Sequence, residues 1–336
     1  MLKVASVVSR LVGLSLAVLA VAAPAAAQER AKLKMVFSIP PDTPVLPYLV
    51  AKDTGWYAQN GLDVEELLLS GDANALRAVL SGNGDVAQFG LSTVLQAIAE
   101  SGMKLKTIGA WQPLVDYQFI AATGKAKRLE DFGGTVFATG SAGSLVSEIP
   151  KLVMRKHGVD MSTMTFVSVG AHSDRLKAVL AGKAQTSMVN MLTAARGVQE
   201  NGVVVIASVK DDFPNLGFSF LSTTQENIAD PKKKRAMEIL VKGGIYGSRY
   251  IHENPAGAAA VLHGRRAEVS ADFITPILVE LNNLGVGGDT GGLAKDVVQF
   301  TADGSHQSKI LSKQIRAEDV METQFVDKAL AELGRR

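Results

Sequence analysis

The sequence predicts an α/β fold of two lobes, each with a parallel-type sheet flanked by helices, and two crossovers of the chain that form a hinge. Short strand-like runs alternate with segments of helical periodicity, which is typical of parallel sheets covered by helices. Several sequence blocks recur in the same order about 100 residues later, which indicates a duplicated unit. The chain of 336 residues is 47% apolar and 20% charged, so it can bury the core of one large or two ordinary domains.

The first lobe opens with a strand in which apolar and polar residues alternate. A proline-rich turn follows, and Leu46, Leu49 and Val50 then mark one face of a helix that ends near Gly55. The next strand, a short helix and a short apolar strand closed by Gly90 complete the unit. In chain order the predicted strand, turn, helix, strand, helix and strand occupy 33–38, 39–44, 46–55, 62–69, 74–81 and 86–89.

A second copy of this unit follows the first. The segment LRAVLSG has its counterpart in LKAVLAG, and two further blocks keep their order at offsets that drift from 97 to 100 residues. Small loop insertions produce such a drift, so the pattern favours duplication over chance similarity of amphipathic helices. The matched pairs are 60–63 with 157–160, Gly71 with Gly170, and 76–82 with 176–182.

The duplication fixes where the chain passes between lobes. We expect crossings near 112–117 and 212–216, because extended runs follow both copies at 117–122 and 217–222. The remainder, from about Asn227, is mostly helical by its caps and spacing and returns to pack on the first lobe. The predicted first lobe is therefore discontinuous, formed by 32–112 and 217–336, and the second lobe is formed by 118–212.

The N-terminal 27 residues have the pattern of a secretory signal peptide. Lys3 and Arg10 precede thirteen apolar or small residues, and small residues up to Ala27 predict cleavage near that point. The alternative, a membrane-spanning anchor, needs about 20 apolar residues. Cleavage removes two of the 35 bases and none of the 33 acids, so the mature chain is formally neutral.

Charge and composition argue against several partners and chemistries. The basic run at 232–235 lacks interleaved aromatic residues and is predicted to be a solvated helix face, so no nucleic-acid partner is expected. The chain has no cysteine, which excludes disulfides, thiolate nucleophiles and cysteine-ligated metals. Its five histidines show no metal-ligand spacing. We therefore expect no metal and no cofactor.

Motifs that resemble catalytic signatures fail on inspection. The glycine-rich run at 285–292 lacks the Gly-Lys-Ser/Thr of a phosphate loop, and Ser101-x-x-Lys104 lacks its partner motifs. Thr139 stands where the nucleophile elbow needs glycine. No catalytic residue is assigned.

The turn at 140–144 is a better candidate for binding. A strand leads into Gly140, Ser141 and Gly143, and Ser141 or Ser144 is suited to cap the helix that follows. Free backbone N–H groups at such a helix start can hold an oxyanion. An ordinary capped helix needs the same glycine and serine residues, so both interpretations stay open on this segment alone.

Three segments together resemble periplasmic solute-binding proteins of ABC importers, in the group that takes nitrate, sulfonates, taurine and thiamine precursors. They are 47–64 (PYLVAKDTGWYAQNGLDV), 76–91 (LRAVLSGNGDVAQFGL) and 129–144 (LEDFGGTVFATGSAGS). The resemblance extends over 33 to about 265. It implies a type II periplasmic-binding fold, a small polar or anionic ligand, a periplasmic monomer, and an inner-membrane ABC permease with a cytoplasmic ATPase as partner.

The site residues follow from duplication and from this resemblance. The loop at 40–44 and the turn at 140–144 follow the first strand of their own copies, so we expect them to face each other across the lobes. Trp111 lies near the crossing, and an alternative structural role for it stays open. The expected ligand-binding residues are Pro41, Asp42, Thr43, Leu91, Ser92, Trp111, Gln112, Gly140, Ser141, Gly143, Ser144 and Asn190.

Two other functions compete with solute binding. An enzyme on the same fold would have to act through a serine or a carboxylate, because cysteine is absent. A structural or signalling ectodomain would need no ligand. Among ligands, Asp42 favours an amine, whereas the helix start at Ser141 favours a sulfonate or carboxylate, and a zwitterion satisfies both.

Overall fold

The computed structural model describes residues 30–69, 71–140 and 145–335. The predicted signal peptide and three predicted site residues, Ser141, Gly143 and Ser144, lie outside the described residues. In the described part of the chain, no helix is both long and apolar enough to cross a membrane.

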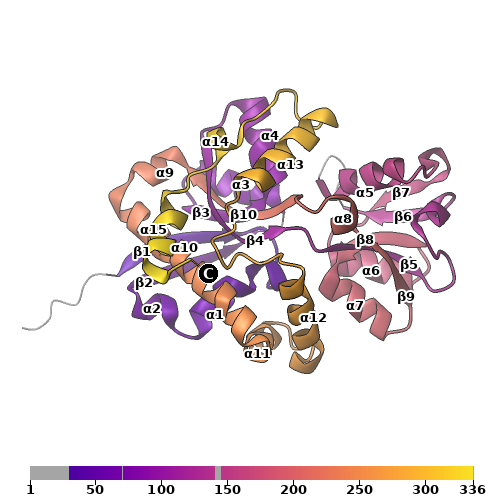
Figure 1. The fold of residues 1–336 in the computed structure, drawn as a ribbon, viewed down its shortest axis with the longest axis horizontal. Helices are drawn as coiled ribbons and strands as arrows, with labels where there is room; N and C mark the ends of the chain where they lie inside the picture. Colours follow the sequence, from indigo (N-terminus) through magenta and orange to yellow (C-terminus); the bar gives the residue numbers. More distant parts are fainter. Residues whose placement is uncertain (1–29, 70, 141–144, 336) are drawn as a thin grey trace, which may run out of the picture.

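The protein contains two five-stranded sheets in separate halves (Figure 1). The first sheet has the strand order β2-β1-β3-β10-β4 and defines the first half, and the second has the order β7-β6-β8-β5-β9 and defines the second half. The strands of the first sheet are β1 (Ala31–Phe37), β2 (Leu62–Leu68), β3 (Val86–Gly90), β4 (Leu105–Leu114) and β10 (Gly217–Thr224). Those of the second are β5 (Tyr117–Ala122), β6 (Val136–Thr139), β7 (Thr165–Ser168), β8 (Thr186–Asn190) and β9 (Val203–Ser208).

Each sheet is mixed, which refines the parallel-type sheets expected from the sequence. Strand β1 pairs in parallel with β2 and β3, whereas β10 pairs antiparallel with β3 and β4. In the second sheet β6 pairs in parallel with β7 and β8, whereas β5 pairs antiparallel with β8 and β9. The antiparallel strands β5 and β10 are the ones that arrive from the other half. Each enters its sheet at the edge where the parallel strands end, whereas a helical connection returns the chain to the edge where they begin.

Helices cover both faces of each sheet. Along β1, Leu33, Met35 and Phe37 point into one apolar cluster and Val36 points into another, as alternation of side chains in a strand requires. The first cluster of the first half contains α1 (Leu46–Asp53), α10 (Pro231–Glu253), α11 (Pro255–Arg265), α12 (Ala271–Asn283) and α15 (Gln324–Leu333). The second contains α3 (Asp72–Leu80), α4 (Leu91–Ser101), α13 (Lys295–Gln307) and α14 (Ala317–Val320).

The second half repeats this layering. Phe119 and Ile120, neighbours in β5, point into separate clusters on the two faces of the sheet. One cluster packs under α5 (Leu145–Lys156) and α8 (Val209–Asp212), and the other under α6 (His172–Leu180) and α7 (Met191–Gln199). The remaining short helices are η1 (Thr43–Val45), α2 (Trp56–Gln59), η2 (Leu129–Phe132), η3 (Met161–Thr163) and α9 (Gln225–Ala229).

Equivalent hydrogen bonds support the repeat. Asp85 accepts a hydrogen bond from the backbone N–H of Lys34 in β1 at 2.8 Å. Its counterpart 100 residues later, Gln185, accepts from the backbone N–H of Val136 in β6 at 2.8 Å. The two copies thus use side chains at the same repeat position to fix the start of their third strand against their first.

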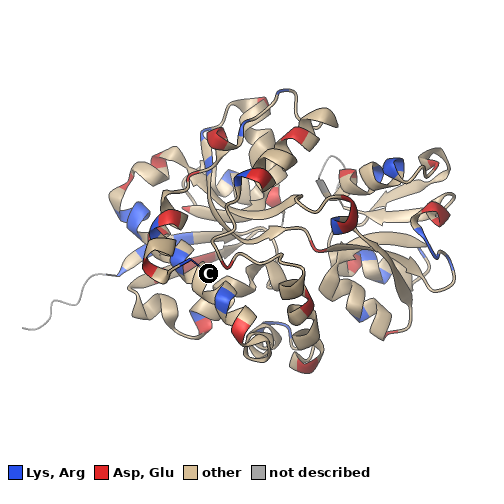
Figure 2. Ribbon diagram, viewed as in Figure 1, with Lys and Arg blue, Asp and Glu red and all other residues tan. Residues whose placement is uncertain are grey.

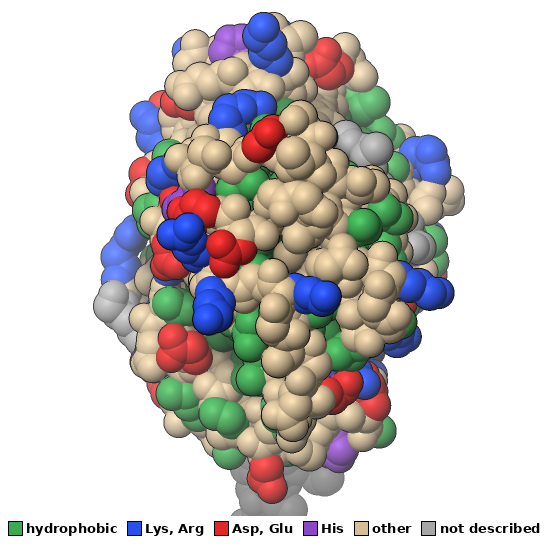
Figure 3. All heavy atoms as spheres, turned by 90° about the vertical axis from the view of Figure 1, so that its right-hand side faces the viewer, with side chains coloured by type: hydrophobic (Ala, Val, Ile, Leu, Met, Phe, Trp, Pro, Cys, Tyr) green, Lys and Arg blue, Asp and Glu red, His purple; other side chains and the backbone are tan. Residues whose placement is uncertain are grey.

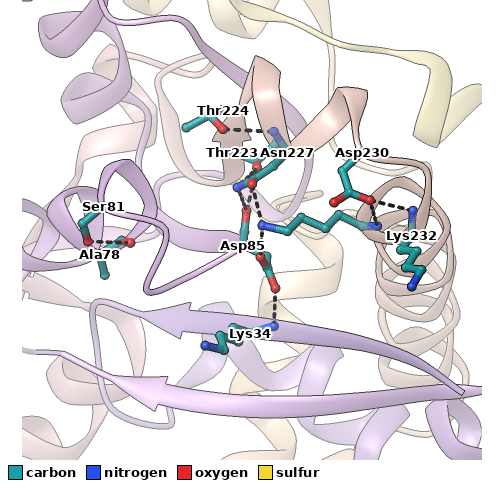
Figure 4. A network of polar contacts seen from close by, with 10 residues as sticks. Lys34, Ala78, Ser81, Asp85, Thr223, Thr224, Asn227, Asp230 and Lys232 are labelled. Atoms are coloured by element: carbon teal, nitrogen blue, oxygen red, sulfur yellow. Dashed lines mark hydrogen bonds and ion pairs between the residues drawn. The ribbon is translucent and has the colours of Figure 1, made fainter.

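The basic run at 232–235 is less solvated than its composition suggests. Lys233 Nζ lies 2.7 Å from Asp85 Oδ1 and donates to Asn227 at 2.8 Å, in a network that Figure 4 shows beside β1. Asp85 is 7% exposed, and its carbonyl oxygen accepts from Thr223 and Asn227. One lysine of the run therefore neutralises a buried carboxylate.

Acidic and basic residues occur along the elements of both halves (Figure 2). On the face of the second half drawn in Figure 3, acidic, basic and apolar side chains are interspersed. A mixed surface does not produce a long-range field of one sign.

Candidate functional site

The two halves meet through a direct contact between two predicted site residues. Asn190 Nδ2, at the end of β8, donates to Asp42 Oδ2, in the loop after β1, at 3.3 Å. Asn190 also caps α7, because its Oδ1 accepts from the backbone N–H of Thr193 at 3.1 Å. This bond fixes the amide, so its N–H group points toward the other half.

Asp42 is held by a third segment that is distant in sequence. Arg266, which directly follows α11, places Nη1 3.0 Å from Asp42 Oδ2, and both side chains are 17% exposed. The backbone N–H of Thr43 donates to Asp42 Oδ1 at 2.7 Å. Burial raises the pKa of Asp42, although Arg266 and the hydrogen bond from Thr43 act in the opposite direction.

The repeat places two further acceptors at equivalent positions. Asp72 Oδ2, at the start of α3, accepts from the backbone N–H of Gly90 at 3.0 Å. His172 Nδ1, at the start of α6, accepts from the backbone N–H of Asn190 at 2.9 Å. Each pair ties the first turn of a helix to the end of the neighbouring strand, with different chemistry in each half.

The contacts of His172 determine its protonation. Its Nδ1 also lies 2.8 Å from Nη2 of Arg175, and both the backbone N–H and the guanidinium can only donate. Nδ1 is therefore an acceptor without a proton, and the proton of the neutral ring sits on Nε2. Burial, followed by repulsion from Arg175, holds the pKa of His172 well below its usual value.

Asp116 lies on the first crossing, between β4 and β5, and is 1% exposed. Its Oδ2 accepts from the backbone N–H of Met191, the first residue of α7, at 3.3 Å. Burial raises the pKa of Asp116 to about 6, and the negative charge of Asp42 adds to the rise, whereas the bond from Met191 and the Gln112 side chain lower the pKa.

Aromatic rings line both crossings. Tyr117, the first residue of β5, has its ring centroid 5.2 Å from that of His172 and 5.2 Å from that of Phe218, near the start of β10. We call the whole group the interlobe site. Its residues are Asp42, Asp72, Gly90, Asp116, Tyr117, His172, Arg175, Asn190 and Arg266.

Four other predicted residues are buried. Ser92, the second residue of α4, is 6% exposed, and Leu91 belongs to an apolar cluster of the first half. Trp111 is 3% exposed and packs against Phe37 and Tyr48, so its indole is part of the core of the first half. Gly140 is buried, and its carbonyl oxygen accepts from Ser168 at 3.1 Å.

The facing of loop 40–44 and turn 140–144 stays a prediction, because most of the turn lies outside the described residues. Asp72, His172 and Arg175 were not predicted as site residues, although the 100-residue offset between the copies pairs Asp72 with His172. Arg266 offered no local signal, since it acts on a residue more than 200 positions away.

A cavity of about 110 Å³ lies in the first half, against the predicted residues Thr43, Trp111 and Gln112. Helix α10 contributes Ser248 and helix α12 contributes Asn282 to its wall. The described residues contain no group of three or more His, Asp or Glu side chains placed to hold a metal ion. The interlobe site itself brings hydrogen-bond donors and acceptors from both halves together, an arrangement that suits a small polar molecule.

Two mixed sheets with two crossings, and polar groups from both at their junction, define a two-lobed molecule of the periplasmic binding protein fold. The chain belongs to the NMT1/THI5-like family, whose sequence profile matches residues 42–258. No curated protein sequence matches the chain significantly.

Solved structures share this fold at low sequence identity. The ligand-binding component of an ABC-type import system from Staphylococcus aureus has a TM-score of 0.72 and 13% identity, with coverage of 89% of this chain and 99% of that one. The nitrate-binding protein NrtA from Synechocystis has a TM-score of 0.71 and 14% identity, with coverage of 91% of this chain and 90% of that one. The aliphatic sulphonate binding protein SsuA from Escherichia coli has a TM-score of 0.66 and 14% identity, with coverage of 88% of this chain and 93% of that one.

Proposed function

We propose that this protein is the solute-binding component of an ABC importer and that it holds a small polar solute at the interlobe site. The contact between Asp42 and Asn190 carries this proposal, because it brings ligand-capable groups from both halves to one place. A solute that contacts both halves stabilises the closed arrangement by its higher affinity for that state. The named relatives, which bind nitrate and aliphatic sulphonates, support the same function.

The wider proposal concerns organisation and location. The mature monomer, cleaved near Ala27, resides in the periplasm and delivers its solute to an inner-membrane permease driven by a cytoplasmic ATPase. Residues 32–112 with 217–336 move as one lobe and 118–212 as the other, about a hinge at the two crossings. Sulfonates, nitrate, taurine and thiamine-precursor-like molecules are the first solutes to test.

Thermal unfolding in the presence of a broad metabolite panel tests solute binding. A ligand that binds only the folded state raises the melting temperature, and calorimetry then gives its affinity. We expect at least one compound to bind with 1:1 stoichiometry and to be recovered unchanged by mass spectrometry. Chemical conversion of the bound compound would favour an enzyme instead, and the absence of any binding compound would contradict the proposal.

Asn190→Ala is the variant that links binding to the site. It removes the amide that joins Asp42 to the second half and should weaken binding about tenfold, which corresponds to roughly 1.4 kcal/mol. Asn83→Ala is the matched control, since Asn83 is exposed and its side chain donates to Ser81 in its own turn. Equal affinity in both variants would place the solute elsewhere.

A further inference from the structure

Asp116 has an unsatisfied hydrogen-bonding group inside the interlobe site. Its Oδ1 is buried and has no hydrogen-bond partner, while Oδ2 accepts one bond from the backbone of Met191. The Gln112 side chain lowers the pKa of the carboxyl group but leaves Oδ1 without a bond of ordinary geometry. A buried carboxylate oxygen without a donor is unfavourable, so this position is suited to a group that a ligand supplies.

The two arginines of the site do not neutralise Asp116. Arg266 forms ion pairs with Asp42 and with Glu268, each at 3.0 Å. Arg175 donates to the backbone oxygens of Met188, at 3.0 Å, and Gly170, and to the ring of His172. Both guanidinium groups are therefore engaged by other partners, and Asp116 keeps an uncompensated negative charge when it is ionised.

We propose that the interlobe site takes a solute with a protonated nitrogen, an ammonium or amidinium group, which donates a hydrogen bond to Asp116 Oδ1. The inference rests on the proposed function and narrows its substrate class. Such a group supplies both the missing donor and the missing positive charge. A nitrate or a simple sulfonate has only acceptors there, and its negative charge would lie beside Asp116 and Asp42.

A zwitterion also fits this arrangement. The protonated nitrogen binds Asp116, and the N–H at His172 Nε2 is a donor of the kind that an acidic group of the same solute requires. Taurine and isethionate provide a matched pair of probes, because they share a sulfonate and differ in carrying an ammonium or a hydroxyl group.

The experiment is a thermal-shift panel with equal numbers of cationic amines and amidines, zwitterions, and anions without N–H donors, followed by calorimetry on each binding compound. We expect the tightest compounds to carry a protonated nitrogen, and taurine to bind more tightly than isethionate wherever either binds. Asp116→Asn should weaken these compounds tenfold or more. Asp63→Asn, an exposed carboxylate on β2, should change their affinity less than twofold.

Wild-type protein provides a second readout that needs no variant. A cation requires ionised Asp116, so its affinity should rise about tenfold between pH 5 and pH 7, given a pKa of about 6 in the free protein. The titratable and charged groups that surround Asp116 and have to be considered in this profile are Asp42, Asp72, Tyr117, His172, Arg175, Arg266 and Glu268.

The outcomes separate the two proposals. Tight binding of nitrate or sulfonates without N–H donors, or amine binding that is the same in Asp116→Asn and at pH 5, would overturn the cationic-group inference and leave solute binding intact. A panel without any binding compound would defeat the proposed function itself. Selective amine binding that is lost in Asp116→Asn supports both.

Discussion

Asp116 shows how a single buried carboxyl group links stability to pH. Its pKa of about 6 in the folded protein lies above the value near 3.8 of an exposed aspartate, so the folded state binds more protons between these pH values. Stability contributed by the protonated group is present below about pH 4 and is lost as the pH rises through 6. At neutral pH the solute-free protein is therefore less stable because of Asp116, the residue to which we expect the solute to bind.

This linkage gives a prediction for the solute-free protein. Asp116→Asn removes the ionisation, so the variant should gain stability relative to wild type by about 2–3 kcal/mol as the pH rises from 4 to 7.5. Urea unfolding of both proteins at the two pH values measures the change. A difference between the two proteins that does not vary with pH would contradict the assignment of a raised pKa.

A second residue-scale prediction concerns the equivalent acceptors Asp85 and Gln185. Asp85→Ala removes the acceptor of the Lys34 N–H and the ion-pair partner of Lys233, and it should lower the free energy of unfolding by about 2–4 kcal/mol. Gln185→Ala removes only a neutral acceptor from the Val136 N–H and should cost about 1–2 kcal/mol. Urea denaturation tests both. Equal losses would indicate that the ion pair of Asp85 contributes nothing.

At the scale of elements, α10 depends on small residues at its contacts. A Cβ atom at Gly247 would overlap the carbonyl oxygen of Pro47 in α1, and one at Gly244 would overlap the indole of Trp111. The backbone of α1 cannot move away without disturbing the core beneath it. This close approach explains why a 23-residue helix carries glycines that its helix propensity disfavours.

The corresponding prediction compares two helical glycines. Gly247→Ala should destabilise the protein by about 1–3 kcal/mol through overpacking. Gly304→Ala in α13 is the control, because a Cβ atom there meets nothing within 4 Å, and it should be neutral or slightly stabilising. Melting temperatures of the two variants decide the matter. A Gly247→Ala protein as stable as wild type would show that α1 and α10 adjust freely.

Elements with a strong local signal could be predicted from the sequence. The predicted strands at 33–38 and 62–69 correspond to β1 (Ala31–Phe37) and β2 (Leu62–Leu68) within two residues at each end. In β1 the alternation marks Leu33, Met35 and Phe37, which share one apolar cluster. The antiparallel direction of β5 and β10 could not be predicted in the same way. Strand direction depends on how each crossing enters a sheet, and neither crossing has a pattern that encodes it.

The residues of the candidate site also differ in how far the sequence indicates them. Asp42 and Asn190 follow the first and third strands of their own copies, so duplication indicated them before any contact was known. Arg266 reaches Asp42 only because α10, α11 and the loop after them return across the first half. Asp116 carries no sequence signal, because its significance comes from burial and an unpartnered oxygen, which a sequence does not display.

At the scale of the whole molecule, contacts between the halves extend beyond Asp42 and Asn190. Leu192 of α7 is 2% exposed and packs within an apolar cluster of the first half. Lys210 of α8 donates to the backbone oxygen of Leu284, at the end of α12. These contacts join α7 and α8 to the C-terminal part of the chain across the junction of the two halves.

The leader gives a prediction about the whole chain. If residues 1–27 are a signal peptide, protein recovered from the periplasm begins at Gln28 and remains in the soluble fraction after osmotic release. Intact mass spectrometry measures this directly. A mass that still includes residues 1–27, or a protein that stays with membranes after a salt wash, would contradict cleavage.

The measurement that tests the central claim most directly is the distance between the two halves with and without solute. The chain has no cysteine, so Glu65→Cys and Lys183→Cys, both at exposed positions, allow specific spin labels on the first and second half. For a solute that binds by calorimetry, the account predicts a broad distance distribution without solute and a single narrow, shorter one at saturation. A distribution that is unchanged by saturating solute would contradict binding between the halves.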